Sequence, residues 1–194
     1  MNELLDRFIP TPDVRERFET TVHAPASVVM DTALKLDMQA VPLVRAIFRL
    51  RGVLLGAKDR SPRPPRGLLE EVQDLGWGVL ADRPGSVIVF GARCQPWLAD
   101  VEFHAIEAEA FAGYSQPGHV KIAWTLETRE VACGVTRFAH ETRAVATGAE
   151  ARVKFLRYWR WARFGIVAIR MLLLPVVRRA AERQWSVKAG AGPR

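Results

Sequence analysis

Two neighbouring runs of alternating apolar and polar residues constrain the fold of this chain most strongly. They are HVKIAWTLETRE (residues 119–130) and GVTRFAHETRAVAT (residues 134–147), joined by the short turn Ala132-Cys133-Gly134. Alternate residues of a strand point to opposite faces of its sheet. One face then carries Val120, Ile122, Trp124 and Leu126 from the first run and Thr136, Phe138, His140, Thr142 and Ala144 from the second. This pattern predicts two strands of an antiparallel sheet with one hydrated face, so another element must cover the apolar face.

The segment from about residue 150 to residue 187 is expected to be the helix that supplies this cover. Its apolar side chains recur every three or four residues and predict a stripe along one side of the helix: Phe155, Trp159, Ala162, Ile166, Ile169 and Leu173. On the other side we expect Arg157, Arg160, Arg163 and Arg170. Gly165 is predicted to divide the helix into segments of about 150–163 and 166–185. Pro175 predicts a kink or a restart near residues 172–175, because proline cannot donate its backbone hydrogen bond.

The basic charge of the chain is concentrated in this segment. From Ala151 onward there are 11 Lys and Arg residues and a single acid, Glu182, whereas residues 1–150 carry 17 basic and 20 acidic residues. A membrane-spanning helix is disfavoured, because the best apolar window, residues 164–177, is shorter than about 20 residues and contains an arginine and a proline. A nucleic-acid-binding arm is disfavoured because its tryptophans lie among apolar residues that favour burial. The segment from Met171 to Val177 is more apolar than contact with one sheet requires. Two interpretations of this excess stay open, a dimer surface and an interfacial membrane contact.

The remainder of the chain predicts further strands and helices of a single domain. We expect a strand ending before Pro25, a helix over PASVVMDTALKLD, a second helix from Pro42, a loop over GAKDRSPRPPRG, a short helix ending at Gly76 and a hairpin over WGVLADRPGSVIVFGAR. The run VEFHAIEAEAF fits either a strand or a short helix. The domain is predicted to cover residues 13–187, with an N-terminal extension over 1–12 and a disordered tail over 188–194. The fold class is α+β.

This order of elements resembles the START-like superfamily of helix-grip proteins, which includes lipid-transfer and bacterial polyketide cyclase/dehydrase-like proteins. The resemblance lies in the opening RFETTVHAPASVVMD, the hairpin GVLADRPGSVIVFG, the strands VKIAWTLET and GVTRFAHETRA, and the closing ARVKFLRYWRWARFG. It implies a curved antiparallel sheet gripping the C-terminal helix, two short helices after the first strand, and an apolar cavity between sheet and helix. The superfamily shares no catalytic motif, so the resemblance predicts a fold and leaves the activity open.

Several side chains are candidates for lining such a cavity. His140 could donate to a ligand or act as a general acid or base, or it could be a core histidine bonded to a neighbouring hydroxyl. Trp124 offers a flat apolar wall. Arg93 could bind an acidic or carbonyl head group if it faces inward with Val87 and Val89; in the other register it is solvated. The remaining candidates are Phe138, Thr142, Trp97, Tyr114, Trp159 and Ile166.

The sequence contains no nucleotide-binding, metal-binding or nucleophile motif that would assign a reaction. Cys94 and Cys133 show no metal-site or disulfide spacing, so we expect no cofactor and no metal, and a cytoplasmic location. The leading hypothesis is the binding of a small hydrophobic ligand, without nucleic acid. A cyclase- or dehydratase-like enzyme, with His140 as acid or base and Arg93 stabilising an oxyanion, is the first alternative. An interaction protein that meets an anionic membrane or a second copy through the C-terminal helix is the second alternative.

Overall fold

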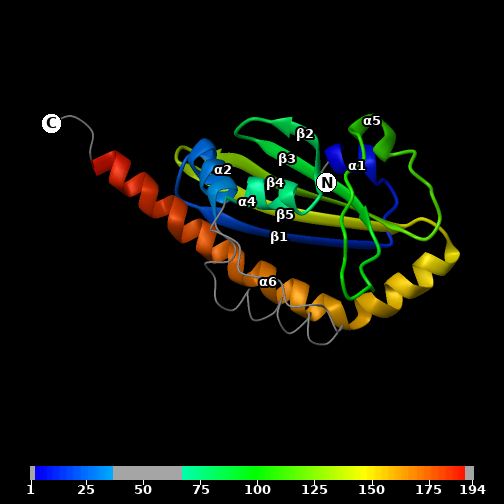
Figure 1. Ribbon diagram of the computed structural model, residues 1–194. Coiled ribbons are helices and arrows are strands. Elements are labelled where there is room, and N and C mark those ends of the chain that lie inside the picture. The colour runs from blue at the N-terminus through cyan, green and yellow to red at the C-terminus, as the bar shows by residue number, and fades with distance from the viewer. Residues whose placement is uncertain (1–2, 37–66, 191–194) are drawn as a thin grey trace.

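A computed structural model describes residues 3–36 and 67–190 of the chain, and its centre is one antiparallel sheet of five strands (Figure 1). In spatial order the strands are β1 (Val14–Val22), β5 (Val135–Ala146), β4 (Val120–Ala132), β3 (Val87–Cys94) and β2 (Gly78–Arg83). The predicted strand pair is therefore β4 and β5, paired antiparallel at the centre of the sheet. The predicted hairpin is β2 and β3. The α+β class is confirmed.

The register of the strands assigns each side chain to one of two faces. Trp124 lies opposite Phe90 on β3 and opposite Thr142 on β5, so these three residues share a face. We call this the inner face, because the long C-terminal helix α6 (Ala149–Gly190) lies along it (Figure 1). The opposite, outer face carries the side chains of Thr125 and Glu141, which are neighbours in the same register.

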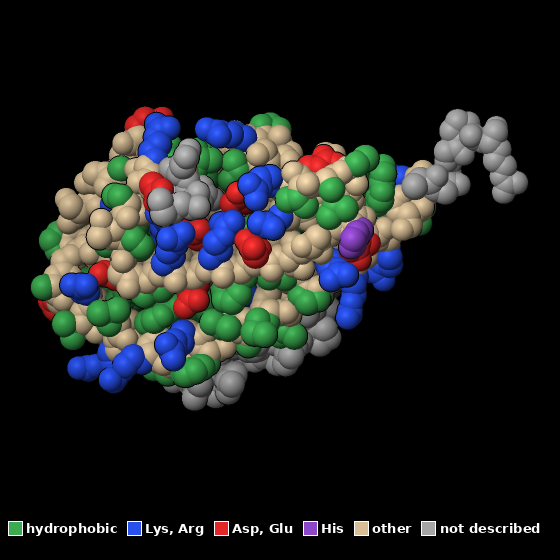
Figure 2. All heavy atoms as spheres, turned by 180° about the vertical axis from the view of Figure 1, so that it is seen from behind, with side chains coloured by type: hydrophobic (Ala, Val, Ile, Leu, Met, Phe, Trp, Pro, Cys, Tyr) green, Lys and Arg blue, Asp and Glu red, His purple; other side chains and the backbone are tan. Residues whose placement is uncertain are grey.

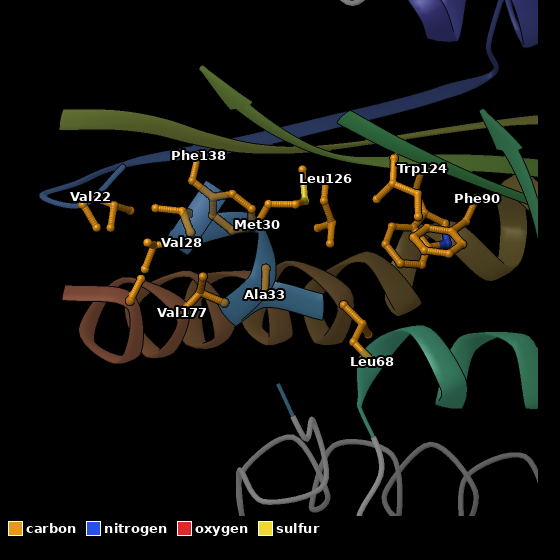
Figure 3. Packing of buried hydrophobic residues seen from close by; sticks show 14 of the residues in the cluster. Val22, Val28, Met30, Ala33, Leu68, Phe90, Trp124, Leu126, Phe138 and Val177 are labelled. Atoms are coloured by element: carbon orange, nitrogen blue, oxygen red, sulfur yellow. The ribbon is translucent and has the colours of Figure 1, made fainter. Parts of the chain in front are cut away.

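The inner face packs against three helices. Besides α6, these are α2 (Ala26–Lys35), which follows Pro25 as predicted, and the short helix α4 (Leu68–Asp74). Figure 3 shows their apolar side chains meeting those of the sheet, with Val28, Met30 and Val177 near Phe138 at one end. Trp124 and Phe90 lie together at the other end of this cluster. The helix predicted from Pro42 and the loop predicted after it lie outside the described residues.

The outer face is covered in part by two short helices, α1 (Glu3–Phe8) and α5 (Ala108–Phe111). Leu5, Phe8 and Phe111 are buried there against Val87 and Val89. Residues 3–9 thus pack on the sheet, within the segment that the sequence suggested to be an extension. The uncertain run VEFHAIEAEAF contains a single β-bridge at His104, followed by α5.

The helix α6 is continuous over 42 residues, so the predicted break at Gly165 and the restart near Pro175 are wrong. A glycine in a helix interior costs only about 1 kcal/mol relative to alanine. Proline costs more, but Leu174 just before Pro175, and Val177 and Ala181 on the following turns, pack into the inner cluster. Tertiary packing on both sides of each helix-breaking residue therefore outweighs its local preference. The helix also extends to Gly190, into the segment that was expected to be a disordered tail.

Candidate functional site

The inner face carries a small polar group at the centre of the sheet, next to a stack of aromatic rings. Strand β5 supplies His140 and Thr142, and strand β4 supplies Trp124 beside them. His140 Nε2 lies 3.0 Å from Thr142 Oγ1, and the His140 ring centroid lies 5.5 Å from that of Trp124. Trp124 in turn stacks on Phe90 with 4.4 Å between ring centroids. The histidine thus makes the hydroxyl contact expected of a core histidine, and it also contacts a charged side chain.

Arg170 of α6 reaches into this polar group, which the sequence did not predict. Its guanidinium contacts His140 Nε2 and lies 3.5 Å from Thr142 Oγ1. The expectation that Arg170 lies with the outward-facing arginines is therefore wrong. It follows Ile169 and stands four residues after Ile166, on the edge of the stripe that faces the sheet. That spacing was the available signal for its inward position.

Burial determines the charge states of both side chains. Burial lowers the pKa of Arg170 to about 10, so the guanidinium remains positively charged at neutral pH. Burial, together with the positive charge of Arg170, holds the pKa of His140 well below its ordinary value of 6.5, although a backbone group of Thr125 acts in the opposite direction. The imidazole is therefore neutral at pH 7. Because Arg170 can only donate, Nε2 accepts, and the ring hydrogen belongs on Nδ1.

Four other candidate residues lie on the inner side of the structure but at its two ends. Phe138 is buried toward α2, in the cluster shown in Figure 3. At the opposite end, Trp97, Trp159 and Ile166 pack together around buried Phe155 and Tyr158 of α6. The predicted apolar stripe of the helix is thus confirmed at Phe155, Ala162 and Ile166. These residues extend the apolar surroundings of the polar group rather than joining it.

Arg93 and Tyr114 lie on the other side of the sheet. Arg93 pairs with Lys121 in the sheet register, so it shares the outer face with Val87 and Val89. Its guanidinium lies 3.1 Å from His119 Nε2 and 5.9 Å from the centroid of the Tyr114 ring. Arg93 and His140 therefore do not converge on one site, and the catalytic pair suggested by the sequence is not formed. The apolar neighbours Val87 and Val89 misled the assignment because α1 and α5 bury the outer face as well.

The described residues contain no group of three or more His, Cys, Asp or Glu side chains that could hold a metal ion. They also contain no helix that is long and apolar enough to cross a membrane.

Comparison with known proteins finds similar solved structures at low sequence identity. No protein-family model and no curated protein matches the chain. The ZhuI aromatase/cyclase from Streptomyces sp. R1128 is similar in structure, with 15% identity and a TM-score of 0.35 over 93% of this chain and 99% of that one. CalU16 from Micromonospora echinospora is similar with 10% identity and a TM-score of 0.30 over 89% and 86% of the two chains. The five-stranded antiparallel sheet and the long C-terminal helix of this chain form a helix-grip arrangement.

Proposed function

We propose that this protein binds a small hydrophobic molecule between the sheet and α6, and that Arg170 contacts an acidic or carbonyl group of that molecule. The observation that carries the proposal is a charged guanidinium held in the layer between sheet and helix, where its described hydrogen-bonding neighbours are the neutral ring of His140 and the hydroxyl of Thr142.

A buried charge without an opposite charge is costly, and proteins usually pair it. Burial is the cause of the lowered pKa of Arg170, and among the described residues no carboxylate acts to raise it. Arg143 on the outer face shows the usual solution: it is 1% exposed and its guanidinium contacts Glu141 and Asp6 at 2.8 and 2.6 Å. A carboxylate or polarised carbonyl on a ligand would give Arg170 the partner that Arg143 finds within the chain.

The surroundings of the polar group favour an apolar ligand body. Trp124 and Phe90 form an aromatic surface beside His140, and Trp77 meets Trp124 edge-on with 6.0 Å between their ring centroids. Aromatic and aliphatic walls with a few convergent polar groups are typical of small-molecule sites. The ligand class we propose is therefore an aromatic, polyketide-like or lipid-like molecule with one acidic or carbonyl end.

A matched pair of fluorescent probes tests this proposal. 8-Anilinonaphthalene-1-sulfonate and N-phenyl-1-naphthylamine share an aromatic body and differ in the anionic group. We expect the wild-type protein to bind the anionic probe more tightly. Arg170→Met should weaken the anionic probe by about 10- to 100-fold, the range of a hydrogen bond to a charged group, and leave the neutral probe nearly unchanged.

Two control variants locate the effect. Arg93→Met removes a guanidinium from the outer face, and Arg160→Gln removes one from the exposed side of α6. Both should bind the two probes like the wild-type protein. The proposal is wrong if neither probe binds, or if Arg93→Met or Arg160→Gln lowers the affinity for the anionic probe as much as Arg170→Met does. If the probes behave as expected, native mass spectrometry of protein purified from its own host would identify the molecule that co-purifies with it.

A cyclase- or dehydratase-like reaction at the same site is a second candidate function. Its support is a neutral imidazole in contact with a guanidinium. Once Arg170 turns its hydrogen bond from His140 Nε2 to a ligand carbonyl, the freed Nε2 lone pair could take a proton from the neighbouring carbon, and Arg170 would stabilise the oxyanion that forms. His140→Gln should then abolish turnover of a polyketide-like substrate while it still binds. Unchanged turnover in that variant would exclude this role.

A further inference from the structure

The outward side of α6 carries large apolar side chains that the fold leaves in solvent. Phe164 and Met171 are each 65% exposed, and Val153 is 61% exposed. Leu156 and Trp161 are 37% and 42% exposed. We call these five residues the outer strip of α6. Single exposed apolar residues are ordinary, but five on one side of one helix form a patch.

The outer strip is continuous along the helix. At 100° per residue, Val153, Phe164 and Met171 fall within about 20° of one another, with Leu156 and Trp161 on either side. From Val153 to Met171 the strip is about 27 Å long. A groove of about 800 Å³ lies at its N-terminal half, lined by Val153, Leu156, Arg157, Trp159, Arg160 and Arg163.

Arginines are interleaved with the apolar residues of the strip. Arg157, Arg160 and Arg163 are exposed, and Arg163 lies over the ring of Phe164 at 4.9 Å from its centroid. Figure 2 shows basic and hydrophobic side chains side by side along the lower edge of the molecule, toward the end where α6 begins. The acids on α6 are Glu150 and Glu182, which lie before and after the strip and pair with Lys154 and Arg178. The strip therefore combines exposed apolar area with three arginines that form no ion pair within the described part of the chain.

We propose that the outer strip of α6 docks onto the surface of an anionic lipid bilayer, with the helix lying in the plane of the interface. Trp161, Phe164 and Met171 would enter the boundary between head groups and acyl chains. The three arginines would contact lipid phosphates or carboxylates, while their aliphatic stems lie along the apolar surface. This role goes beyond ligand binding and does not depend on the inner site.

The charge of the strip favours a membrane over a second copy of the chain. A symmetric dimer through this surface would place the arginines of one copy near those of the other, since the same patch is used twice. An anionic bilayer instead offers negative charge and an apolar layer together, which matches both components of the strip. Nucleic acid would match the arginines but would leave Val153 and Met171 without a partner.

Co-sedimentation with lipid vesicles tests the proposal. The full-length protein should bind vesicles of phosphatidylcholine with 30% phosphatidylglycerol, and should bind pure phosphatidylcholine far more weakly. Replacing Arg157, Arg160 and Arg163 together by glutamine should reduce binding by about 100-fold, at about fivefold per arginine near an anionic surface. Phe164→Ser with Met171→Ser should also reduce binding, through lost apolar contact.

A matched control removes the same charge from the other end of the helix. Arg179, Arg183 and Lys188 are exposed and lie beyond the strip, so their triple glutamine variant should bind anionic vesicles nearly as the wild-type protein does. The proposal is overturned if the two triple variants lose binding equally, or if the wild-type protein stays in the supernatant with anionic vesicles. It is also overturned if sizing chromatography shows a dimer that dissociates on Phe164→Ser, or if nucleic acid competes away all vesicle binding. Circular dichroism would confirm that each variant is folded.

Discussion

His140→Gln should remove a pH dependence of stability that the wild-type protein shows just below neutral pH. His140 is 4% exposed, and burial together with the nearby charge of Arg170 holds its pKa well below the ordinary value of 6.5. In the unfolded chain the same imidazole regains its ordinary pKa. Between these two values the unfolded state binds a proton that the folded state does not bind.

The sign and the size of the effect follow from this difference. Stability rises with pH wherever the unfolded state binds more protons, so the contribution of His140 is full at neutral pH and is lost as the pH falls below about 6.5. Between pH 7.0 and pH 5.5 the loss amounts to about 1.3 kcal/mol of unfolding free energy, provided that the folded imidazole stays neutral throughout. Glutamine does not titrate, so the variant lacks this term.

Urea unfolding followed by tryptophan fluorescence, at pH 7.0 and at pH 5.5, measures the effect. The drop in unfolding free energy should be about 1.3 kcal/mol larger for the wild-type protein than for His140→Gln. The other titrating groups are common to both proteins and cancel in this comparison. Equal drops in the two proteins would show that His140 titrates alike in the folded and unfolded states. The account of a neutral imidazole beside Arg170 would then be wrong.

Three further substitutions test the packing around the site, each by urea unfolding. Pro175→Ala should raise the unfolding free energy by about 1–3 kcal/mol, because it restores a helix hydrogen bond inside α6. Gly91→Ala should lower it by about 1–3 kcal/mol, because the new Cβ would lie 2.4 Å from Leu80 Cδ1 and 2.7 Å from Phe111 Cε2. Glu141→Gln should lower it by about 3 kcal/mol at pH 7, because a fully buried carboxylate that three arginines contact loses its charge. Burial alone would raise the pKa of Glu141, but the arginines lower it overall, so the difference between this variant and the wild-type protein should shrink as the pH falls below about 4.5.

Much of the fold was predictable because its signals are local. The strands β4 and β5 alternate cleanly, α2 follows a proline, and the hairpin contains Pro84-Gly85, where Gly85 has a φ of 71°. The continuity of α6 was not predictable, because Gly165 and Pro175 act locally against a helix that the packing of distant strands holds together. Local preferences cannot show how strongly tertiary contacts oppose them.

The candidate site was predictable only in part. Alternation divides the side chains of a strand between two faces, but it does not show which of the two faces lies toward α6. On β4 and β5 the polar and apolar residues differ enough to identify the inner face. On β3 every residue except Arg93 is buried, since helices cover both faces, and the apolar residues beside Arg93 therefore gave no orientation. The contrast that decides the face of Arg93 lies in the register with Lys121 of β4, which the sequence of one strand does not contain.

Arg143 of the sheet and Arg170 of α6 show how the site differs from the rest of the core. Arg143 lies on the outer face, where ion pairs with Glu141 and Asp6 offset the desolvation cost of its burial. Arg170 on the inner side meets a histidine that its own charge helps to keep neutral, so that contact satisfies a hydrogen bond without offsetting the charge. If Arg170 served stability alone, methionine in its place should stabilise the protein, because the substitution removes the desolvation cost of a charge that no described carboxylate pairs. A gain in stability for Arg170→Met, together with a loss of anionic-probe binding, would mark Arg170 as a group kept for its ligand.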